Sequence, residues 1–195
     1  MVAIIDYDAG NLRSVEKALE ALGAETVVTR DPDVIAGCSR VILPGVGSFG
    51  DAMERLNQYV LPDVIRRTVS DRKPFLGICL GLQLLFEESQ ESPGVSGLGI
   101  LKGKILKIPP AEGLKIPHMG WNSLELRQGS RLFAGIRNQE YVYFVHSYYL
   151  KAEEESQVAA TTWYGTEIHA AVEAGNVFAC QFHPEKSGED RKSVV

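Results

Sequence analysis

The chain has 195 residues, enough to bury a sizeable core within one domain spanning residues 1–195. Its 45% hydrophobic and 23% charged residues are typical of a globular protein. A net charge of −5 without any long basic cluster argues against nucleic-acid binding. No apolar run is long enough to cross a bilayer, and the N-terminal MVAIIDYDAG does not resemble a signal peptide. We therefore expect a cytoplasmic protein that binds neither nucleic acid nor membrane.

Cysteine and histidine usage argues against disulfides and metals. The three cysteines are an odd number at wide spacing, which does not suggest a disulfide framework. The four histidines are scattered, and neither a C-x-x-C nor an H-E-x-x-H pattern is present. We expect a reducing compartment, no metal site and no cofactor.

The first half of the chain alternates short apolar segments with amphipathic ones. Four segments have the pattern of strands, at residues 2–7, 26–29, 41–43 and 74–78. Three helices are expected: one capped by Asn11 and ended by Gly23, one over residues 52–69 with a kink at Pro62, and one over residues 80–88. This order predicts an α/β fold with an open, mostly parallel, doubly wound sheet flanked by helices.

The second half is richer in β-patterns. Lysines alternate with aliphatic residues over 100–108, as in a half-exposed strand. Further strands are expected at residues 121–126, 141–149, 158–163, 168–172 and 177–182, with a turn at 175–176. The sequence thus predicts an added antiparallel portion. Sites in open α/β sheets lie at the carboxyl ends of strands, so the loop at 44–51, Cys79 and the segment after Phe182 are expected on one edge.

Cys79 lies between the expected strand ending at Ile78 and the expected helix beginning at Leu80. Gly77 and Gly81 flank it, which is the spacing of a strained strand-to-helix turn that presents a nucleophile. The N-terminus of the following helix would favour a thiolate. The alternative is an ordinary buried cysteine, since free cysteine is among the most buried residue types. The paired glycines favour a catalytic role.

His183-Pro184-Glu185 closes the last apolar strand. A thiol nucleophile needs a base to accept its proton and an acceptor to hold the imidazole in one tautomer. His183 and Glu185 supply these groups, and Pro184 restricts the backbone between them. Alone, this tripeptide is more often a surface turn. Together with a cysteine at a strand-to-helix corner, it predicts a Cys-His-Glu triad.

The segment PGVGSFGD at residues 44–51 supplies a third feature. Its glycines free the backbone to turn N–H groups toward a ligand or an oxyanion. It could instead be a plain loop in which Ser48 or Asp51 caps the next helix, or a phosphate cradle. The absence of a G-x-x-x-x-G-K-[ST] pattern argues against the cradle.

Together these blocks resemble the class I (triad) glutamine amidotransferases. Within them the chain is similar to the glutaminase subunits of imidazole glycerol phosphate synthases, which belong to histidine biosynthesis. The resemblance spans most of the chain and is carried by PGVGSFGDAM at 44–53, GICLGLQLLFEESQE at 77–91, PHMGWN at 117–122, YFVHSYY at 143–149 and QFHPEKS at 181–187. The segments PGVGSF, HMGWN and HPEKS distinguish this subunit from the anthranilate, carbamoyl-phosphate and GMP synthesis relatives.

The resemblance implies a role for each matched position. The triad would comprise the nucleophile Cys79, the base and acid His183, and its orienter Glu185. Backbone groups of the oxyanion hole would come from Val46, Gly47 and Leu80. Contacts to the glutamine substrate would come from Gln83, His146, Ser147 and Tyr148. Positions facing the synthase partner or the ammonia route would be Asn11, Trp121, Tyr143 and Lys186, although a Trp or Tyr in an apolar strand is more often part of a core.

The implied activity is hydrolysis of L-glutamine through a glutamyl thioester on Cys79. The ammonia would pass to a (β/α)8-barrel cyclase subunit, which makes imidazole glycerol phosphate and an aminoimidazole carboxamide ribotide. The resemblance also implies that the glutaminase has almost no activity until partner and ligand bind. A peptide flip within the loop at Val46 and Gly47 would explain this low activity.

The chain departs from the family after HPEKS, where an apolar C-terminal helix usually follows. Here the chain ends SGEDRKSVV, which is too short and polar for such a helix. We hypothesise a truncated or altered end that leaves an apolar groove partly uncovered.

Three alternatives remain open. One is another triad amidotransferase, such as the glutaminase of pyridoxal-phosphate synthase, against which HMGWN and PGVGSF argue. Another is a non-catalytic binding or redox-sensing module with a reactive Cys79. The third is a cysteine peptidase of similar fold, which would typically lack this arrangement of Gln83 and HPE.

Overall fold

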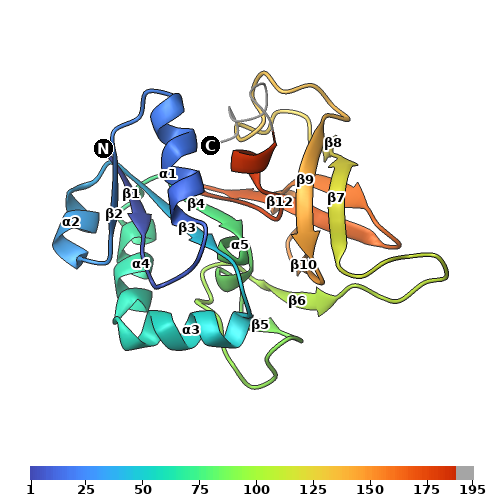
Figure 1. Cartoon of the computed structure of the whole chain (residues 1–195), viewed down its shortest axis with the longest axis horizontal. Coiled ribbons are helices and arrows are strands. Elements are labelled where there is room, and N and C mark those ends of the chain that lie inside the picture. Colours follow the sequence, from blue (N-terminus) through green and yellow to red (C-terminus); the bar gives the residue numbers. More distant parts are fainter. Residues whose placement is uncertain (188–195) are drawn as a thin grey trace.

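The computed structural model describes residues 1–187, with an eight-stranded sheet at its centre (Figure 1). The order of its strands is β2-β1-β3-β4-β13-β12-β11-β8. The parallel strands are β1 (Val2–Ile5), β2 (Thr26–Thr29), β3 (Arg40–Gly45), β4 (Phe75–Cys79) and β13 (Val177–Cys180). The antiparallel strands that extend the sheet are β12 (Glu167–Ala174), β11 (Val158–Trp163) and β8 (Glu125–Leu126). The predicted fold class is confirmed.

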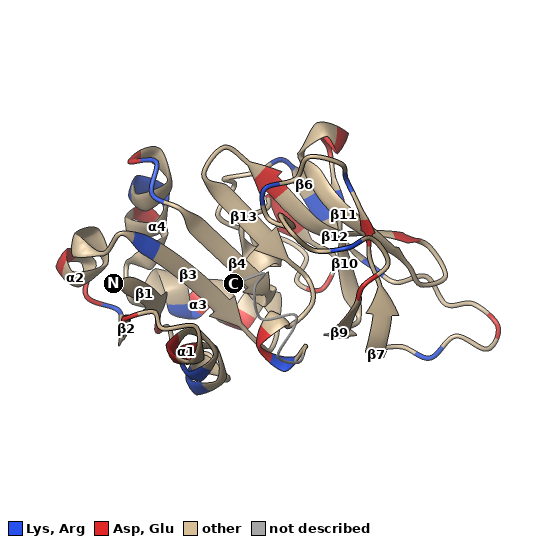
Figure 2. Cartoon of the chain, turned by 90° about the horizontal axis from the view of Figure 1, so that it is seen from above, with Lys and Arg blue, Asp and Glu red and all other residues tan. Residues whose placement is uncertain are grey.

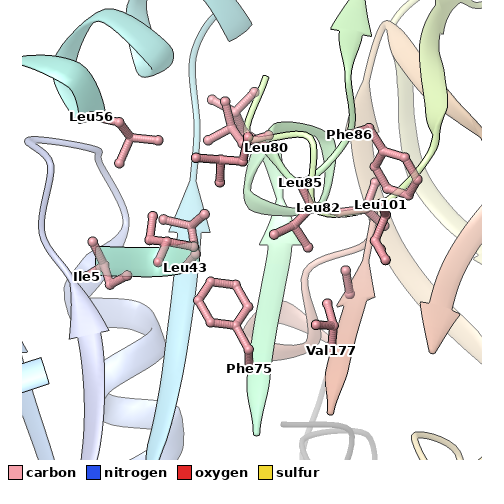
Figure 3. Close-up of a cluster of buried hydrophobic side chains, with 14 of the residues drawn as sticks. Ile5, Leu43, Leu56, Phe75, Leu80, Leu82, Leu85, Phe86, Leu101 and Val177 are labelled. Carbon is pink, nitrogen blue, oxygen red and sulfur yellow. The ribbon is translucent and has the colours of Figure 1, made fainter. Parts of the chain in front are cut away.

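Helices cover both faces of the parallel strands. One face packs against α1 (Leu12–Ala21), which contributes the buried Val15 and Leu19. The other face packs against α2 (Pro32–Gly37), α3 (Phe49–Gln58), α4 (Leu61–Ser70) and α5 (Leu80–Leu84). Figure 3 shows how Leu43 and Phe75 of the sheet meet Leu56 and Leu80 of these helices in a continuous core. This packing is the main apolar burial that holds the carboxyl ends of β3 and β4 in place.

Two smaller sheets stand beside the antiparallel end. One contains β10 (Tyr148–Ala152), β6 (Gly103–Lys107) and β5 (Glu88–Ser89), and the other is a ribbon of β7 (His118–Ser123) and β9 (Tyr141–His146). Short 3-10 helices are η1 (Glu155–Gln157) and η2 (Pro184–Lys186). In Figure 1 the ribbon lies next to η2, and η2 follows directly on β13 after His183.

Two expected helices differ from the prediction. The single helix over 52–69 is instead two helices, because the chain turns at Tyr59 and Val60, with Val60 at φ 56°, and Pro62 begins a new first turn. The helix over 80–88 ends at Leu84. N–H groups of the segment 97–101 donate to the carbonyls of Leu84 and Leu85, in place of the N–H groups of a further helical turn. Glu88, which was expected in the helix, belongs to β5.

Several strands also begin or end at other residues than expected; for example, β6 covers Gly103–Lys107 within the expected 100–108, and β13 ends at Cys180 before the expected Phe182. The strand expected over 141–149 is interrupted at Ser147 and forms two strands, and the segment 121–126 is divided between β7 and β8. The first strand ends at Ile5 rather than at Tyr7, whose hydroxyl donates to the carbonyl of Pro44 at 3.0 Å. The turn at 175–176 is present, with Gly175 at φ 60° between β12 and β13.

Figure 2 marks charged residues on the helices, the loops and several strands, whereas β4 and β13 carry none. A buried strand in a parallel sheet is covered on both faces, which accounts for this composition. Among residues 1–187, no helix combines the length and the apolar character needed to cross a membrane.

An apolar groove of about 450 Å³ lies on the α1 face of the sheet. Described residues that line it include Leu19, Leu22, Ile42, Leu76 and Phe178. The expected alteration of the C-terminal end concerns residues 188–195, which lie outside the part of the chain that the structure describes.

Candidate active site

Cys79 occupies a strained corner between β4 and α5. Its φ of 54° and ψ of −108° lie outside the regions that L-residues ordinarily adopt. The flanking glycines make the corner possible, because a Cβ on Gly77 would lie 2.7 Å from the carbonyl oxygen of Gly81, and a Cβ on Gly81 would overlap the carbonyl oxygen of Leu43. The sequence prediction of a strand-to-helix corner is therefore confirmed by the backbone.

His183 and Glu185 come together directly after β13. The imidazole Nδ1 donates to Glu185 Oε1 at 2.7 Å, and both side chains are buried, at 1% and 0% exposure. Because the carboxylate accepts at Nδ1, the other ring nitrogen, Nε2, is directed away from it. Nε2 is buried and has no hydrogen-bond partner within residues 1–187. It is thus available to the neighbouring thiol of Cys79.

The electrostatics of this pair favour a charged imidazole. Burial lowers the pKa of His183, but interactions with Cys79 and with Glu185 outweigh burial and raise it to about 9. Burial alone would raise the pKa of Glu185. The hydrogen bond and charge of His183, with smaller contributions that include Asn11, outweigh burial and lower this pKa below its ordinary value. An imidazolium held between a carboxylate and a sulfur is the arrangement that stabilises a thiolate.

A cavity of about 460 Å³ opens in front of Cys79 and His183. It is lined by every residue predicted for the oxyanion hole and for substrate contact, namely Val46, Gly47, Leu80, Gln83, His146, Ser147 and Tyr148. Glu185 is the one predicted triad member that does not line it, because it lies behind His183. The structure thus brings the predicted residues to one pocket, while their roles remain predictions.

The loop predicted to contribute to an oxyanion hole follows β3. Val46 is 39% exposed, and Gly47 has a φ of 108° that L side chains rarely adopt. Ser48 caps α3 by accepting from the N–H of Asp51 at 3.3 Å, as one alternative interpretation expected. The N–H groups of Phe49 and Gly50 already donate to Glu91 and Ser92. These donors are therefore occupied, which removes support for a phosphate cradle.

The wall opposite the loop is held by a chain of neutral side chains. His146 Nδ1 donates to the carbonyl of Tyr148 at 2.8 Å, and its Nε2 lies 3.0 Å from Nδ1 of His118. Burial lowers the pKa of His118 to about 4 and that of His146 to about 3. Both rings are therefore neutral at pH 7, and the carbonyl of Tyr148 selects the tautomer of each.

The four residues predicted to face a partner lie around Glu185 and η2. Asn11 Nδ2 donates to Glu185 Oε1 at 2.6 Å, so its side chain does not cap α1 as the sequence suggested. Trp121 is 51% exposed and meets the ring of Tyr143 edge-on at 5.9 Å, and Lys186 Nζ lies 5.8 Å from the same ring. Trp121 is thus a surface residue, not a core one.

Two residues were not predicted as site residues from the sequence. Glu91 lines the cavity, with Oε2 held by the N–H of Phe49 at 2.7 Å, yet in the sequence it is one of several acidic residues after the expected helix. Gln181 is fully buried and its Nε2 lies 3.6 Å from the sulfur of Cys79. A polar residue inside the apolar run VFACQF was the available signal.

The described residues contain no group of three or more His, Cys, Asp or Glu side chains placed to hold a metal ion.

Comparisons with known proteins agree with this geometry. Residues 3–195 match the family described as glutamine amidotransferase class-I. The imidazole glycerol phosphate synthase subunit HisH of Methanocaldococcus jannaschii is 51% identical over 195 residues, which is 100% of this chain and 96% of that protein. The subunit of the same name from Aquifex aeolicus is 52% identical over 185 residues, or 94% of this chain and 88% of that protein.

Solved structures share the fold. A crystal structure of a glutamine amidotransferase has a TM-score of 0.77 at 23% identity, covering 98% of this chain and 94% of that one. The structure of PurLQS from Thermotoga maritima has a TM-score of 0.75 at 25% identity, covering 99% and 94%. Sequence and fold agree with the geometry at Cys79, and the chain belongs to the class I glutamine amidotransferase family.

Proposed function

We propose that this chain is the glutaminase subunit of an imidazole glycerol phosphate synthase, acting in the cytoplasm and supplying ammonia to a (β/α)8-barrel cyclase. The observation that carries the proposal is the buried His183–Glu185 pair, with an Nδ1 to Oε1 distance of 2.7 Å, whose imidazole interacts with the strained Cys79 at the same cavity. The relatives named as subunits of this synthase, at about half identity over the full length of the chain, support the choice of complex.

The reaction follows from the positions of these groups. The thiolate of Cys79 attacks the side-chain amide carbon of L-glutamine, and the carbonyl oxygen becomes an oxyanion. His183 gives its proton to the amide nitrogen, the C–N bond breaks, and ammonia leaves a glutamyl thioester. His183 then takes a proton from water, whose oxygen attacks the thioester. Expulsion of the sulfur as thiolate yields glutamate and restores the starting state.

Binding of glutamine would use both ends of the cavity. Glu91 is held at the start of α3 through Oε2, and its carboxylate can accept hydrogen bonds from the substrate ammonium group. The segment 146–148 forms the opposite wall, and backbone N–H groups of Leu80 and of the loop at Val46 and Gly47 would serve the oxyanion. A substrate the size of a single amino acid suits the volume of about 460 Å³.

The partner surface would lie around η2 and the outer face of the β7–β9 ribbon. Met119, Trp121 and Tyr141 are all more than half exposed there, and Lys186 lies beside them. A cluster of exposed aromatic and apolar side chains is typical of a protein interface. Asn11, next to Glu185, would link this surface to the triad.

Glutamate release tests the proposal. The isolated chain and its mixture with the cyclase subunit and nucleotide ligand are assayed with L-glutamine, each with Cys79→Ala as the blank. Strong release that needs the cyclase and disappears in Cys79→Ala is expected. Equal ammonia from wild type and Cys79→Ala would exclude an enzymatic thiol, and failure to co-purify with the cyclase would favour another triad amidotransferase.

A further inference from the structure

Gln181 lies beside Cys79 because two parallel strands end side by side. β13 pairs with β4 in a register that places Cys180 opposite Ile78. The next residues are Gln181, directly after the end of β13, and Cys79, the last residue of β4. Gln181 is 0% exposed, in a region where most neighbours are apolar. A polar side chain buried this deeply requires hydrogen-bond partners, and these partners define what it does.

The side-chain amide of Gln181 bridges two residues of the site. Its Nε2 lies 3.6 Å from the sulfur of Cys79, within reach of an N–H···S hydrogen bond. Its Oε1 accepts from Nε2 of Gln83 at 2.9 Å. Gln83 lies in α5, one turn beyond the nucleophile, so the bridge joins the end of β13 to the helix that starts at Cys79.

The direction of this bridge is set by a backbone carbonyl. The carbonyl of Tyr148 can only accept, and Gln83 Nε2 donates to it at 3.1 Å. The amide group of Gln83 must therefore place its nitrogen on this side, where its second hydrogen reaches Gln181 Oε1. Since the oxygen of Gln181 faces Gln83, its NH2 group faces the sulfur. The orientation follows from the acceptor and not from a choice between two flipped amides.

We propose that Gln181 is a further catalytic residue whose side-chain amide donates a hydrogen bond to the Cys79 sulfur and stabilises its negative charge. This inference rests on the proposed glutaminase function. The sulfur carries that charge twice in the cycle: before it attacks the amide carbon, and when the C–S bond of the thioester breaks and the electron pair returns to sulfur. A donor at this position assists both steps, and it acts on sulfur, whereas the oxyanion hole acts on oxygen.

Other titratable groups near the sulfur cannot replace this donor. The hydroxyl of Tyr7, in the loop after β1, already donates to the carbonyl of Pro44 at 3.0 Å, and the thiol of Cys180 in β13 donates to the carbonyl of Phe182 at 3.6 Å. Burial raises the pKa of both groups, so both are neutral at pH 7 and add no positive charge beside the sulfur. His183 is the charged neighbour, and it must give up its proton to the leaving ammonia. During that step Gln181 is the neutral donor that stays on the sulfur, and it needs no partner protein to be in place.

The test is the pH dependence of thiol alkylation by iodoacetamide, measured on the isolated chain without glutamine or cyclase. Rates for Cys79→Ala are subtracted to remove the contribution of the other cysteines. In Gln181→Met, which keeps the length of the side chain but has no donor, the midpoint of thiolate formation is expected to rise by about one pH unit, and kcat with the cyclase to fall about tenfold at little change in KM. Gln181→Glu, which replaces the donor with a carboxylate, should raise the midpoint further.

Thr162→Val is the matched control, because Thr162 is 2% exposed and donates one buried hydrogen bond, to the carbonyl of Ser123 at 2.8 Å, outside the cavity. It should lose stability without moving the alkylation midpoint. Unchanged midpoints in both folded Gln181 variants would overturn the inference.

A measurement on the wild type covers the case of unfolded variants. The side-chain 15N–1H signals of Gln181 should shift as the thiol titrates in the wild type and should not shift in Cys79→Ala. Wild-type signals that stay constant across the titration would also overturn the inference. Shifted midpoints in a chain that never hydrolyses glutamine with the cyclase would support the hydrogen bond and contradict the proposed function.

Discussion

The two sides of the catalytic cavity are built in opposite ways. Cys79 is 7% exposed, and its corner has no spare room, since a methyl group on Gly81 would overlap the carbonyl oxygen of Leu43. Val46 across the cavity is 39% exposed, and a methyl group on Gly47 would meet no atom within 4 Å. One side is a packed sheet edge, and the other is an open loop.

This difference separates two tasks. The packed side holds the thiol of Cys79, the His183–Glu185 pair and the amide of Gln181 through hydrogen bonds within the chain. The open side can change its backbone at small cost, because Val46 and Gly47 are exposed and a side chain at Gly47 would meet no atom within 4 Å. A control mechanism that acts on such an enzyme would therefore act on the loop. Five substitutions test the contrast.

The largest effect is expected for Cys79→Ala on the packed side. Loss of the nucleophile should reduce glutamine hydrolysis with the cyclase by at least about 10⁴, as losses of comparable nucleophiles do. Coupled measurement of glutamate release gives the rate. Cys38→Ala removes another buried thiol, at 2% exposure and outside the cavity, and should retain full activity. If Cys79→Ala were as active as Cys38→Ala, the thioester mechanism would be excluded.

Glu185→Gln should cost about 10³ in kcat, because the imidazole loses the carboxylate that holds its tautomer. The pKa of His183, about 9 in the wild type, should fall toward its ordinary value, as an NMR titration would show. A pKa raised on folding stabilises the fold fully below about pH 6.5, and this contribution is lost as the pH rises through 9. The variant should lose the part of that pH dependence that comes from Glu185, while the part from Cys79 stays.

Glu167→Gln is the control for this prediction, since Glu167 lies 4.0 Å from His169 and is 56% exposed. It should leave both kcat and the titration of His183 unchanged. An unaltered titration in Glu185→Gln itself would show that the carboxylate does not hold the imidazolium.

Gly81→Ala should lower the free energy of unfolding by about 3 kcal/mol, because the added methyl group forces backbone apart at the corner. Urea unfolding followed by circular dichroism measures it. Gly37→Ala, at the end of α2, adds a methyl group with nothing within 4 Å and at an ordinary φ, so it should be neutral or slightly stabilising. Equal stabilities of the two variants would mean that the corner is not tightly packed.

Asn11→Ala should reduce kcat about tenfold while KM stays within about twofold, since a hydrogen bond to the buried carboxylate of Glu185 is lost. Asn11→Asp should be worse, because two carboxylates would then meet at 2.6 Å. Steady-state kinetics with saturating cyclase separate the two constants. A change confined to KM would assign Asn11 to binding and not to positioning Glu185.

Gly47→Ala is expected to have the smallest effect on stability, about 1 kcal/mol, from the unfavourable φ of 108° alone. Its effect should appear in the ratio of hydrolysis rates with and without the cyclase, which falls if the loop must rearrange. Stability and this ratio are measured on the same preparation. A stability loss as large as that of Gly81→Ala would erase the contrast between the two sides.

Much of the site could be predicted because its signals are local. Gly77 and Gly81 indicate the corner at Cys79, and the His-Pro-Glu tripeptide brings base and orienter together through neighbouring residues. The strand order alternates with helices in a way that determines a parallel sheet. Each of these features depends on residues close in the chain.

The parts that were missed depend on contacts between distant segments. Gln181 reaches Cys79 only through the pairing of β13 with β4, and Glu91 reaches the start of α3 only in the folded chain. The helix expected over 52–69 divides at Val60, whose positive φ no local pattern indicates for a β-branched residue. The length of α5 is limited by the segment 97–101, which follows it in sequence but packs back onto it.

The alternation of side chains along β13 has a consequence for how such a protein can change over evolutionary time. In the segment that continues β13, Gln181 and His183 are two residues apart, so Gln181 lies beside the Cys79 sulfur and His183 lines the cavity, while Phe182 between them faces the core. Adding or deleting one residue after Val177 would exchange these faces and present Phe182 to the thiol. The stretch 109–113, exposed throughout in the segment between β6 and β7, carries no such constraint. Lineages of this enzyme should therefore vary in length there, and keep the distance from Val177 to His183 constant.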